Sequence, residues 1–285
     1  MSMRELLTSL GLIDPNMLAS EWHDPKQNFA MLKDIRSGII FLEGEPAMDY
    51  ATNPGLSYWD AATLTEAREK TADDDNRRFK DFKPWIKAAR RVLEFGCGNG
   101  GFISQVGSKG TAVEIQADAA RFLRESGLTI LDKIPRAGET LPYDLVCSFH
   151  VLEHLMDPIG TLRQLKDVMA PGGKLIIEVP HAKDFLQEFL NLDCFRAKSY
   201  RGEHLLLHTH ESLTKFLEVA GFKNVKVEGY QRHSMNNHLY YAVKQKPGES
   251  MRTWDFLLTP ALKREYASVM ERIGMTDTLI AFAEA

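Results

Sequence analysis

The chain has 285 residues, 44% of them hydrophobic and 26% charged, which is the balance of an ordinary globular protein with a sizeable core. The net charge of −4 excludes the basic field that gathers nucleic acid, so we expect no nucleic-acid partner. The apolar runs fall short of the roughly 20 residues of a membrane span. The N-terminus lacks the core of a signal peptide, and three widely spaced cysteines argue against a disulfide framework, so we expect a cytoplasmic protein.

The N-terminal residues 1–85 carry several turn signals and many aromatic side chains but few clean strand patterns. We expect a helical or irregular region here. Its aromatic side chains suit either a helical core or the stacking of a flat substrate. We therefore assign residues 1–85 as a region that caps the substrate.

Residues 92–100 read Val-Leu-Glu-Phe-Gly-Cys-Gly-Asn-Gly. The first four predict a short buried strand, and the three alternating glycines predict a sharp turn without a Cβ to obstruct a ligand. A helix-compatible run follows over 101–106. Strand, bare loop and helix together bring backbone N–H groups toward a nucleotide-like ligand.

From residue 91 to residue 245, short apolar runs alternate with amphipathic ones, which is typical of a parallel α/β sheet. The expected strands cover 91–95, 111–115, 128–131, 143–149 and 174–179. The expected helices cover 101–106, 116–125, 160–169 and 211–220. Residues 181–210 interrupt the alternation with a polar, histidine-bearing insertion. We expect it to cover the carboxyl edge of the sheet, where ligands bind in such folds.

The C-terminal third begins with two β-rich runs, 225–230 and 238–244, which are close enough to pair as an antiparallel hairpin. Beyond Lys246-Pro247-Gly248 the sequence predicts a helical tail. The chain therefore divides into the cap region, a ligand-binding α/β domain over 86–246 and a C-terminal helical tail over 247–285.

Two carboxylates bracket the glycine loop, Glu94 before it and Glu114 at the end of the next apolar run. Gly96, Gly98 and Gly101 also match the spacing of NAD-binding loops, so the glycines alone do not identify the ligand. Glu94 would repel a pyrophosphate but suits a cationic ligand such as S-adenosylmethionine (SAM). Glu114 is spaced to meet ribose hydroxyls, which both ligands carry.

Two later motifs resemble those of class I SAM-dependent methyltransferases, most closely the branch that acts on sugars and small molecules. They are Leu141-Pro-Tyr-Asp-Leu-Val-Cys-Ser-Phe-His-Val-Leu-Glu-His-Leu-Met-Asp-Pro158 and Met169-Ala-Pro-Gly-Gly-Lys-Leu-Ile-Ile-Glu-Val-Pro180. With the glycine loop, the resemblance covers residues 91–182. It implies a Rossmann-like, seven-stranded sheet whose last two strands form an antiparallel hairpin, with SAM as the cofactor.

Carried over by position, the resemblance implies cofactor contacts at the ends of the first four strands. The contacts expected around the glycine loop and the second strand are Glu94, Gly96, Cys97, Gly98, Glu114 and Ile115. The contacts expected after the third and fourth strands are Asp132, Ser148, Phe149 and His150. For Cys97, the alternative is a small apolar filler within the loop.

Methyl transfer to a hydroxyl needs a base, so histidines near the expected site are informative. His150 and His181 directly follow the fourth and fifth strands. Glu203-His204, within the insertion, resembles the Glu-His pair of sugar methyltransferases, which supplies their base. We predict His204 as the base, assisted by Glu203, with His150 and His181 as further catalytic candidates.

The sequence thus predicts a SAM-dependent methyltransferase acting on a hydroxyl of a sugar or glycan-type small molecule. A quinone or phenol acceptor is the alternative, because quinone methyltransferases share the Val-Leu-Glu-His motif. A SAM-binding protein without turnover and an NAD-dependent dehydrogenase are further alternatives. No metal is expected, although His204, His208 and His210 could be ligands. A homo-oligomer is left open.

Overall fold

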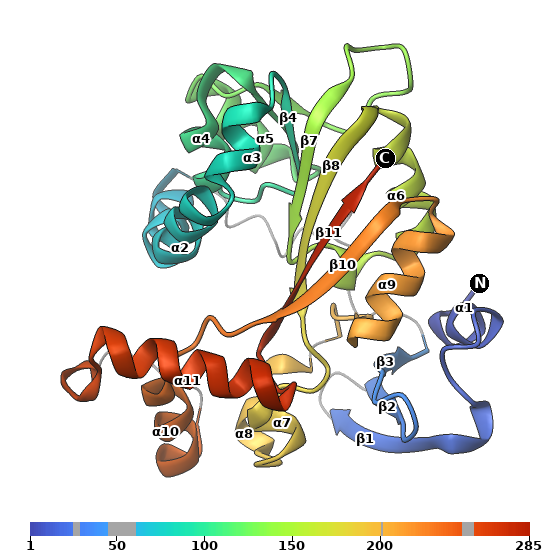
Figure 1. Ribbon diagram of the computed structural model, residues 1–285, viewed down its shortest axis with the longest axis vertical. Coiled ribbons are helices and arrows are strands. Elements are labelled where there is room, and N and C mark those ends of the chain that lie inside the picture. The colour runs from blue at the N-terminus through green and yellow to red at the C-terminus, as the bar shows by residue number, and fades with distance from the viewer. Residues whose placement is uncertain (25–28, 45–60, 201, 247–253) are drawn as a thin grey trace.

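Figure 1 shows the computed structural model of the protein, which describes residues 1–24, 29–44, 61–200, 202–246 and 254–285. Its main body is a seven-stranded sheet of order β10-β11-β8-β7-β4-β5-β6. The strands are β4 (Val92–Phe95), β5 (Gly110–Val113), β6 (Ile130–Leu131), β7 (Tyr143–Phe149), β8 (Met169–Pro180), β10 (Lys223–Tyr230) and β11 (Thr278–Glu284). The pairs from β8 to β6 are parallel, so the predicted Rossmann-like α/β fold is confirmed.

Helices cover both faces of this sheet (Figure 1). One layer contains α2 (Ala61–Asp81), α3 (Lys83–Ala88), α4 (Gly101–Val106), the short η3 (Gly107–Lys109) and α5 (Ala117–Glu125). The other contains α6 (Pro158–Asp167) and α9 (His210–Val219). The helices expected over 101–106, 116–125, 160–169 and 211–220 are therefore confirmed, with ends that shift by at most two residues.

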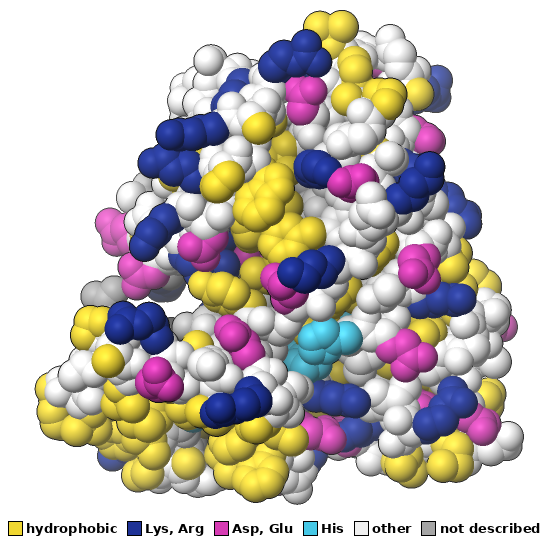
Figure 2. Space-filling view, in the orientation of Figure 1, with side chains coloured by type: hydrophobic (Ala, Val, Ile, Leu, Met, Phe, Trp, Pro, Cys, Tyr) yellow, Lys and Arg dark blue, Asp and Glu magenta, His cyan; other side chains and the backbone are white. Residues whose placement is uncertain are grey.

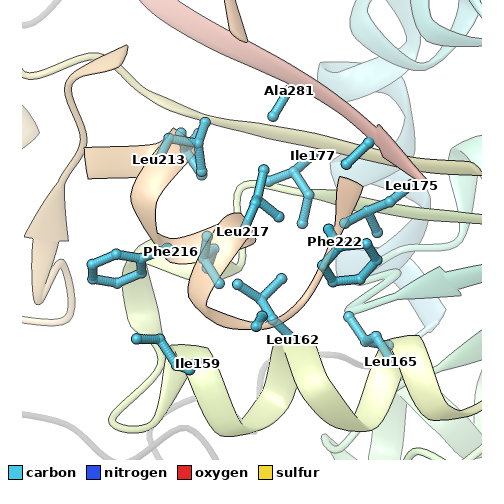
Figure 3. Close-up of a cluster of buried hydrophobic side chains, with 14 of the residues drawn as sticks. Ile159, Leu162, Leu165, Leu175, Ile177, Leu213, Phe216, Leu217, Phe222 and Ala281 are labelled. Atoms are coloured by element: carbon cyan, nitrogen blue, oxygen red, sulfur yellow. The ribbon is translucent and has the colours of Figure 1, made fainter. Parts of the chain in front are cut away.

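Alternation along the strands explains why two cores form. Successive side chains of a strand point to opposite faces, so Leu145 and Cys147 of β7 join the core under α3 and α4, whereas Val146 joins the core under α6 and α9. Figure 3 shows the second core, in which Leu162 of α6 and Leu217 of α9 lie against the sheet. Each such fully buried side chain stabilises the fold by about 1.5–3 kcal/mol.

The last strands of the sheet differ from the prediction. β10 contains the expected strand at 225–230, but residues 238–244 lie in a helix, α10 (Met235–Lys244). This helix buries Asn237, Tyr240 and Tyr241, at the three- and four-residue spacing of one helix face. The predicted hairpin partner at 238–244 is therefore wrong, because the buried residues of this segment follow the period of a helix.

The true partner of β10 comes from the region expected to be a helical tail. β11 inserts between β8 and β10 and pairs antiparallel with both. Over its described residues, 254–285, the tail is thus helical only in η5 (Asp255–Leu257) and α11 (Pro260–Ile273). Residues 278–284 read Thr-Leu-Ile-Ala-Phe-Ala-Glu. A strand buried on both faces shows an unbroken apolar run rather than alternation, which a pattern search does not distinguish from a helix.

The N-terminal region contains more β-structure than predicted. Beyond α1 (Met3–Ser9) and η1 (Pro15–Met17), it forms an antiparallel sheet of order β1-β2-β3-β9, whose last strand comes from the insertion. The strands are β1 (Leu18–Asp24), β2 (Phe29–Asp34), β3 (Ile40–Glu43) and β9 (Leu206–Leu207). The expectation of few strands is wrong here. β1, β2 and β3 pair in sequence order, and β3 also pairs with a segment more than 150 residues later, which local patterns do not reveal.

The insertion and the N-terminal sheet lie together beyond one end of the main sheet. Figure 1 shows α7 (Phe185–Glu188), α8 (Asp193–Ser199) and β1 to β3 beyond the lower end, where β8 ends. The capping role of residues 1–85 stays a prediction, and residues 45–60 of that region lie outside the described part.

Apolar side chains gather over the lower left of the face in Figure 2, where Figure 1 has α10 and α11. Exposed members of these two helices are Leu239, Val243 and Ile273. Among the described residues, no helix combines the length and apolar character needed to cross a bilayer.

Candidate active site

The glycine loop after β4 has one face packed and one face open. Gly96 has φ +74°, and a Cβ added there would lie 2.5 Å from Cγ2 of Val151. Gly98 has φ +52°, and a Cβ there would meet no atom within 4 Å. Only glycine adopts these conformations at low cost. The loop therefore packs against the end of β7 at Gly96 and offers open space at Gly98.

Glu114 fixes the loop from the end of β5. Its Oε2 accepts the Gly98 N–H at 2.8 Å, and its Oε1 accepts the Gln116 N–H at 2.8 Å. The side chain is buried, and burial raises its pKa despite these hydrogen bonds. Each carboxylate oxygen has a second lone pair, so Glu114 can also accept from two neighbouring hydroxyls of a ligand.

Glu94 is a buried acid whose charge is not balanced locally. The residue is 4% exposed, and its Oε2 has no hydrogen-bond partner among the described residues. Burial raises its pKa well above the ordinary value, although Arg78 opposes this shift. A buried carboxylate is expensive unless a cation or donor meets it, so Glu94 favours a positively charged ligand beside the loop.

Helix α2 packs on the far end of the loop. Arg68 donates from Nε to the Asn99 carbonyl at 2.7 Å, and Asn99 Nδ2 donates to Thr71 Oγ1 at 3.0 Å. The second guanidinium nitrogen of Arg68, Nη2, is buried without a partner within the described part of the chain. The unpartnered oxygen of Glu94 and this guanidinium donor thus lie at the two ends of the same loop, which suits a ligand carrying both charges.

The remaining cofactor contacts expected from the sequence lie at the ends of three strands. Ile115, after β5, is 50% exposed and offers an apolar surface. Asp132, after β6, pairs with Arg124 at 2.6 Å and is mostly exposed. Cys97 is buried within the core under α4, which is the filler role considered as its alternative.

Ser148 and Phe149 face inward at the end of β7. Ser148 Oγ donates to the Phe95 carbonyl at 3.1 Å. Phe149 stacks on Phe82 with ring centroids 5.9 Å apart, and the Arg78 guanidinium lies 4.6 Å from its ring centroid. Ser148 thus contacts β4, and Phe149 contacts α2 and the residue between α2 and α3. The predicted contact of both residues with the cofactor stays a prediction.

His150 occupies a strained position at the carboxyl end of β7. Its φ is +54°, which a residue with a Cβ rarely adopts, and its N–H donates to the Glu178 carbonyl at 2.9 Å. Its Nδ1 lies 3.4 Å from Glu153 Oε1. Burial, together with Arg232, holds the pKa of His150 well below its usual range. Such strain is typical of positions where function dictates the conformation.

Three further side chains form one cluster beside His150. Ligand atoms of Glu153, His154 and His204 all lie within 4.8 Å of one another, and the two imidazole centroids are 4.8 Å apart. Glu153 is 1% exposed, and burial raises its pKa to about 8. Glu153 is therefore an acid close to His204. The role of Glu203, which was predicted from the sequence to assist His204, stays a prediction. The carbonyl of Glu203 accepts a hydrogen bond from His154 Nδ1 at 2.7 Å.

The other predicted histidines lie in separate surroundings. His181 donates from Nδ1 to the Thr276 carbonyl at 2.9 Å, and its ring lies edge-on to that of His210. His208 is fully buried, with Nδ1 3.0 Å from Ser212 Oγ. Within the described residues, the candidate ligands His204, His208 and His210 do not form one group.

A family profile described as a methyltransferase domain matches residues 64–227, which is more than half of the chain. The chain belongs to this methyltransferase family. The match spans α2, the glycine loop, the β7 end and the insertion, so the site described above lies within it.

The methyltransferase resembles curated proteins over most of its length. It is 26% identical over 230 residues to a ubiquinone biosynthesis O-methyltransferase of Dinoroseobacter shibae, covering 74% of this chain and 81% of the relative. It is 27% identical over 231 residues to a protein of the same name from Ruegeria pomeroyi, covering 75% and 82%.

Solved structures share its fold. A SAM-dependent methyltransferase from Archaeoglobus fulgidus matches with a TM-score of 0.51 and 20% identity, covering 79% of this chain and 100% of that one. The plantazolicin methyltransferase, solved with S-adenosylhomocysteine, matches with a TM-score of 0.51 and 14% identity, covering 81% and 92%.

SAM is the cofactor that the sequence motifs imply, and the solved structures that share the fold include SAM-dependent methyltransferases. The residues present fit this ligand, because the orphaned oxygen of Glu94 suits its cationic part and the open face at Gly98 leaves room for it. Arg68, which lies far from the loop in the chain, and His154 were not identified as site residues from the sequence. The adjacency of Glu153 and His154 just after the fourth strand was the only signal for the cluster.

Proposed function

We propose that this methyltransferase transfers the methyl group of SAM to a hydroxyl on an aromatic ring, of the quinone or phenol class. The observation that carries this proposal is the likeness, over three quarters of the chain, to relatives named ubiquinone biosynthesis O-methyltransferases. The sugar or glycan acceptor predicted first has no such support. A phenol is also the easier nucleophile, because it ionises near pH 10, well below an aliphatic hydroxyl.

Residues at the glycine loop would hold the cofactor. We propose that Glu114 accepts hydrogen bonds from the ribose hydroxyls, and that Glu94 balances the ammonium and sulfonium charges. Arg68 Nη2, with no partner among the described residues, would bind the carboxylate of the methionine part. Ile115 offers an apolar surface for the adenine, and Asp132 lies at the next strand end for its amino group. When bound, SAM supplies an electrophilic methyl group on its sulfonium.

The acceptor would approach from the end of β7. The acceptor oxygen attacks the methyl carbon, the carbon–sulfur bond breaks, and the hydroxyl proton leaves to a neighbouring base or to solvent. We propose that His150, held in its left-handed conformation beside Glu153, contacts the acceptor hydroxyl. Catalytic roles for His204 with Glu203, and for His181, stay predictions.

A direct competition between acceptors tests this function. The purified protein would be incubated with methyl-labelled SAM and either a 1,2-dihydroxyphenyl compound or a sugar nucleotide. We expect label on the phenol oxygen and none on the sugar. Label on the sugar alone would overturn the proposal, and SAM binding without any transfer would favour the alternative of a binding protein.

A further inference from the structure

An acid interrupts the apolar run of β8 near its end. Glu178 lies between Ile177 and Val179, and its side chain is wholly buried. Successive side chains of a strand alternate, so Ile177 and Val179 join the core under α6 and α9, whereas Glu178 faces the layer that contains α2. A carboxylate removed from water is costly unless donors meet it, so its partners indicate its role.

Two arginines of α2 meet this carboxylate. Arg77 donates from Nη1 to Oε1 at 2.8 Å and from Nη2 to Oε2 at 3.0 Å, and Arg78 donates from Nε to Oε2 at 2.9 Å. Burial opposes ionisation, but the two guanidinium groups outweigh it and hold the pKa of Glu178 below its usual range. A bidentate pair fixes direction as well as distance. We call Glu178, Arg77 and Arg78 the latch, because they join α2 to the end of β8.

The same helix holds the cofactor loop. Its residues that contact the loop or the latch recur at intervals of three or four, which places them along one face of α2: Arg68, Thr71, Asp75 and Arg78. Arg78 pairs with Asp75 at 3.4 Å, and Asp75 accepts from Thr71 Oγ1 at 2.8 Å. Thr71 in turn accepts from the Asn99 side chain, and Arg68 donates to the Asn99 carbonyl. A continuous line of polar contacts thus runs from the latch to the loop.

The distance between latch and loop makes the cofactor site sensitive to the angle of α2. Arg68 and Arg78 are ten residues apart, which is about 15 Å along a helix axis. A tilt of about 4° at Arg78 would therefore move Arg68 by about 1 Å. A hydrogen bond does not survive such a shift, because its heavy-atom distance spans only about 2.7–3.2 Å. The contact is also tight, since a Cβ added at Gly101 would lie 2.1 Å from Asp75 Oδ2.

We propose that Glu178 is a positioning residue for the cofactor. Through the two arginines of the latch, it holds α2 at the angle at which Arg68 meets the methionine carboxylate of SAM. This role rests on the cofactor contact proposed for Arg68. Glu178 also fixes the acceptor side, because its carbonyl accepts the His150 N–H at 2.9 Å. One residue at the end of β8 therefore orients both the helix beside the cofactor and the histidine proposed to contact the acceptor.

SAM affinity, measured by calorimetry on the full-length protein, tests this role without any acceptor. Arg68→Met should weaken binding by about 10–100-fold, which is the contribution of a hydrogen bond to a charged group. Glu178→Gln keeps the shape of the side chain but loses the charge that both arginines bind, and we expect about tenfold weaker binding, within that range. Glu188→Gln is the matched control. Glu188 pairs with Lys33, and neither belongs to α2 or to the loop, so SAM affinity should stay at the native value.

A double variant identifies how Glu178 acts. If the latch works by placing Arg68, its loss has no effect once Arg68 is gone. Arg68→Met combined with Glu178→Gln should therefore bind SAM as weakly as Arg68→Met alone. If Glu178 instead attracted the cationic cofactor through space, the two losses would be independent and their fold-changes would multiply. Multiplied losses would overturn the proposal.

Urea unfolding of each variant separates positioning from stability. If Glu178→Gln does not fold, Arg77→Met replaces it and should weaken SAM binding by about fivefold, because Arg78 still holds Glu178. A folded latch variant that is less stable but binds SAM as tightly as the native protein would overturn the positioning role. Unchanged affinity in Arg68→Met would overturn it together with the Arg68 contact. Methylation of a sugar rather than a phenol would refute the proposed acceptor and leave the latch standing.

Discussion

The contact between Gly96 and Val151 makes the glycine loop intolerant of a single methyl group. In Gly96→Ala, the new Cβ would lie 2.5 Å from Val151 Cγ2 and 3.1 Å from its Cγ1, and valine cannot rotate away easily. The left-handed backbone, at φ +74°, costs alanine about 1–2 kcal/mol. Overpacking adds about 1–3 kcal/mol, so we expect a total loss of about 2–5 kcal/mol in the free energy of unfolding.

Two matched variants separate these contributions. Gly127 has φ +86° and open space around its Cβ position, so Gly127→Ala should lose only the backbone part, about 1–2 kcal/mol. Adding Val151→Ala to Gly96→Ala should recover part of the overpacking as a coupling energy of about 1–2 kcal/mol. Urea unfolding measures each value. Equal losses in Gly96→Ala and Gly127→Ala, with no coupling to Val151, would refute the close packing of the loop against the end of β7.

Two further predictions concern the cofactor and pH. Glu114→Ala removes a charged acceptor worth about 2 kcal/mol, so calorimetry should show about 30-fold weaker SAM binding. Glu125→Ala, at an exposed position, should leave the SAM affinity unchanged. Unchanged affinity in Glu114→Ala would disprove the ribose contact. Burial lowers the pKa of His208 to about 3, so below about pH 6.5 the unfolded chain takes up a proton that the folded one does not. Stability should therefore fall between pH 6.5 and pH 3, by about 2 kcal/mol at pH 5 from this residue. His208→Gln should flatten that slope in urea unfolding at pH 8 and pH 5, and an identical slope would contradict the assignment.

The half of the fold around the glycine loop could be predicted because its signals are local. A short apolar strand, three glycines and an amphipathic run follow one another within residues 92–106, and the structure has β4, the loop and α4 there. β11 could not be predicted in this way. Its two faces are buried in the two different cores, Leu279 and Ala281 on one side and Ile280 on the other, and this removes the alternation that identifies a strand.

The site residues also divide into those with local sequence signals and those that only the tertiary fold brings to the site. Glu94, Glu114 and the loop glycines follow from adjacent sequence, whereas Arg68 reaches the loop from another helix, 31 residues before Asn99. The proximity of His204 to Glu153 could not be read from the chain, because the two residues lie about 50 positions apart. The insertion brings His204 to η4 (Leu152–His154) through the tertiary fold, which local sequence patterns do not reveal.

The position of β11 has a consequence for the order in which the protein assembles. β8 has no neighbour on one side until residues 278–284 have left the ribosome, and β10 reaches the sheet only through that same strand. During synthesis of α10 and α11, the nascent chain therefore exposes a long unpaired edge, a state prone to unwanted association. Completion of this enzyme's central sheet is set by a segment made well after its cofactor loop.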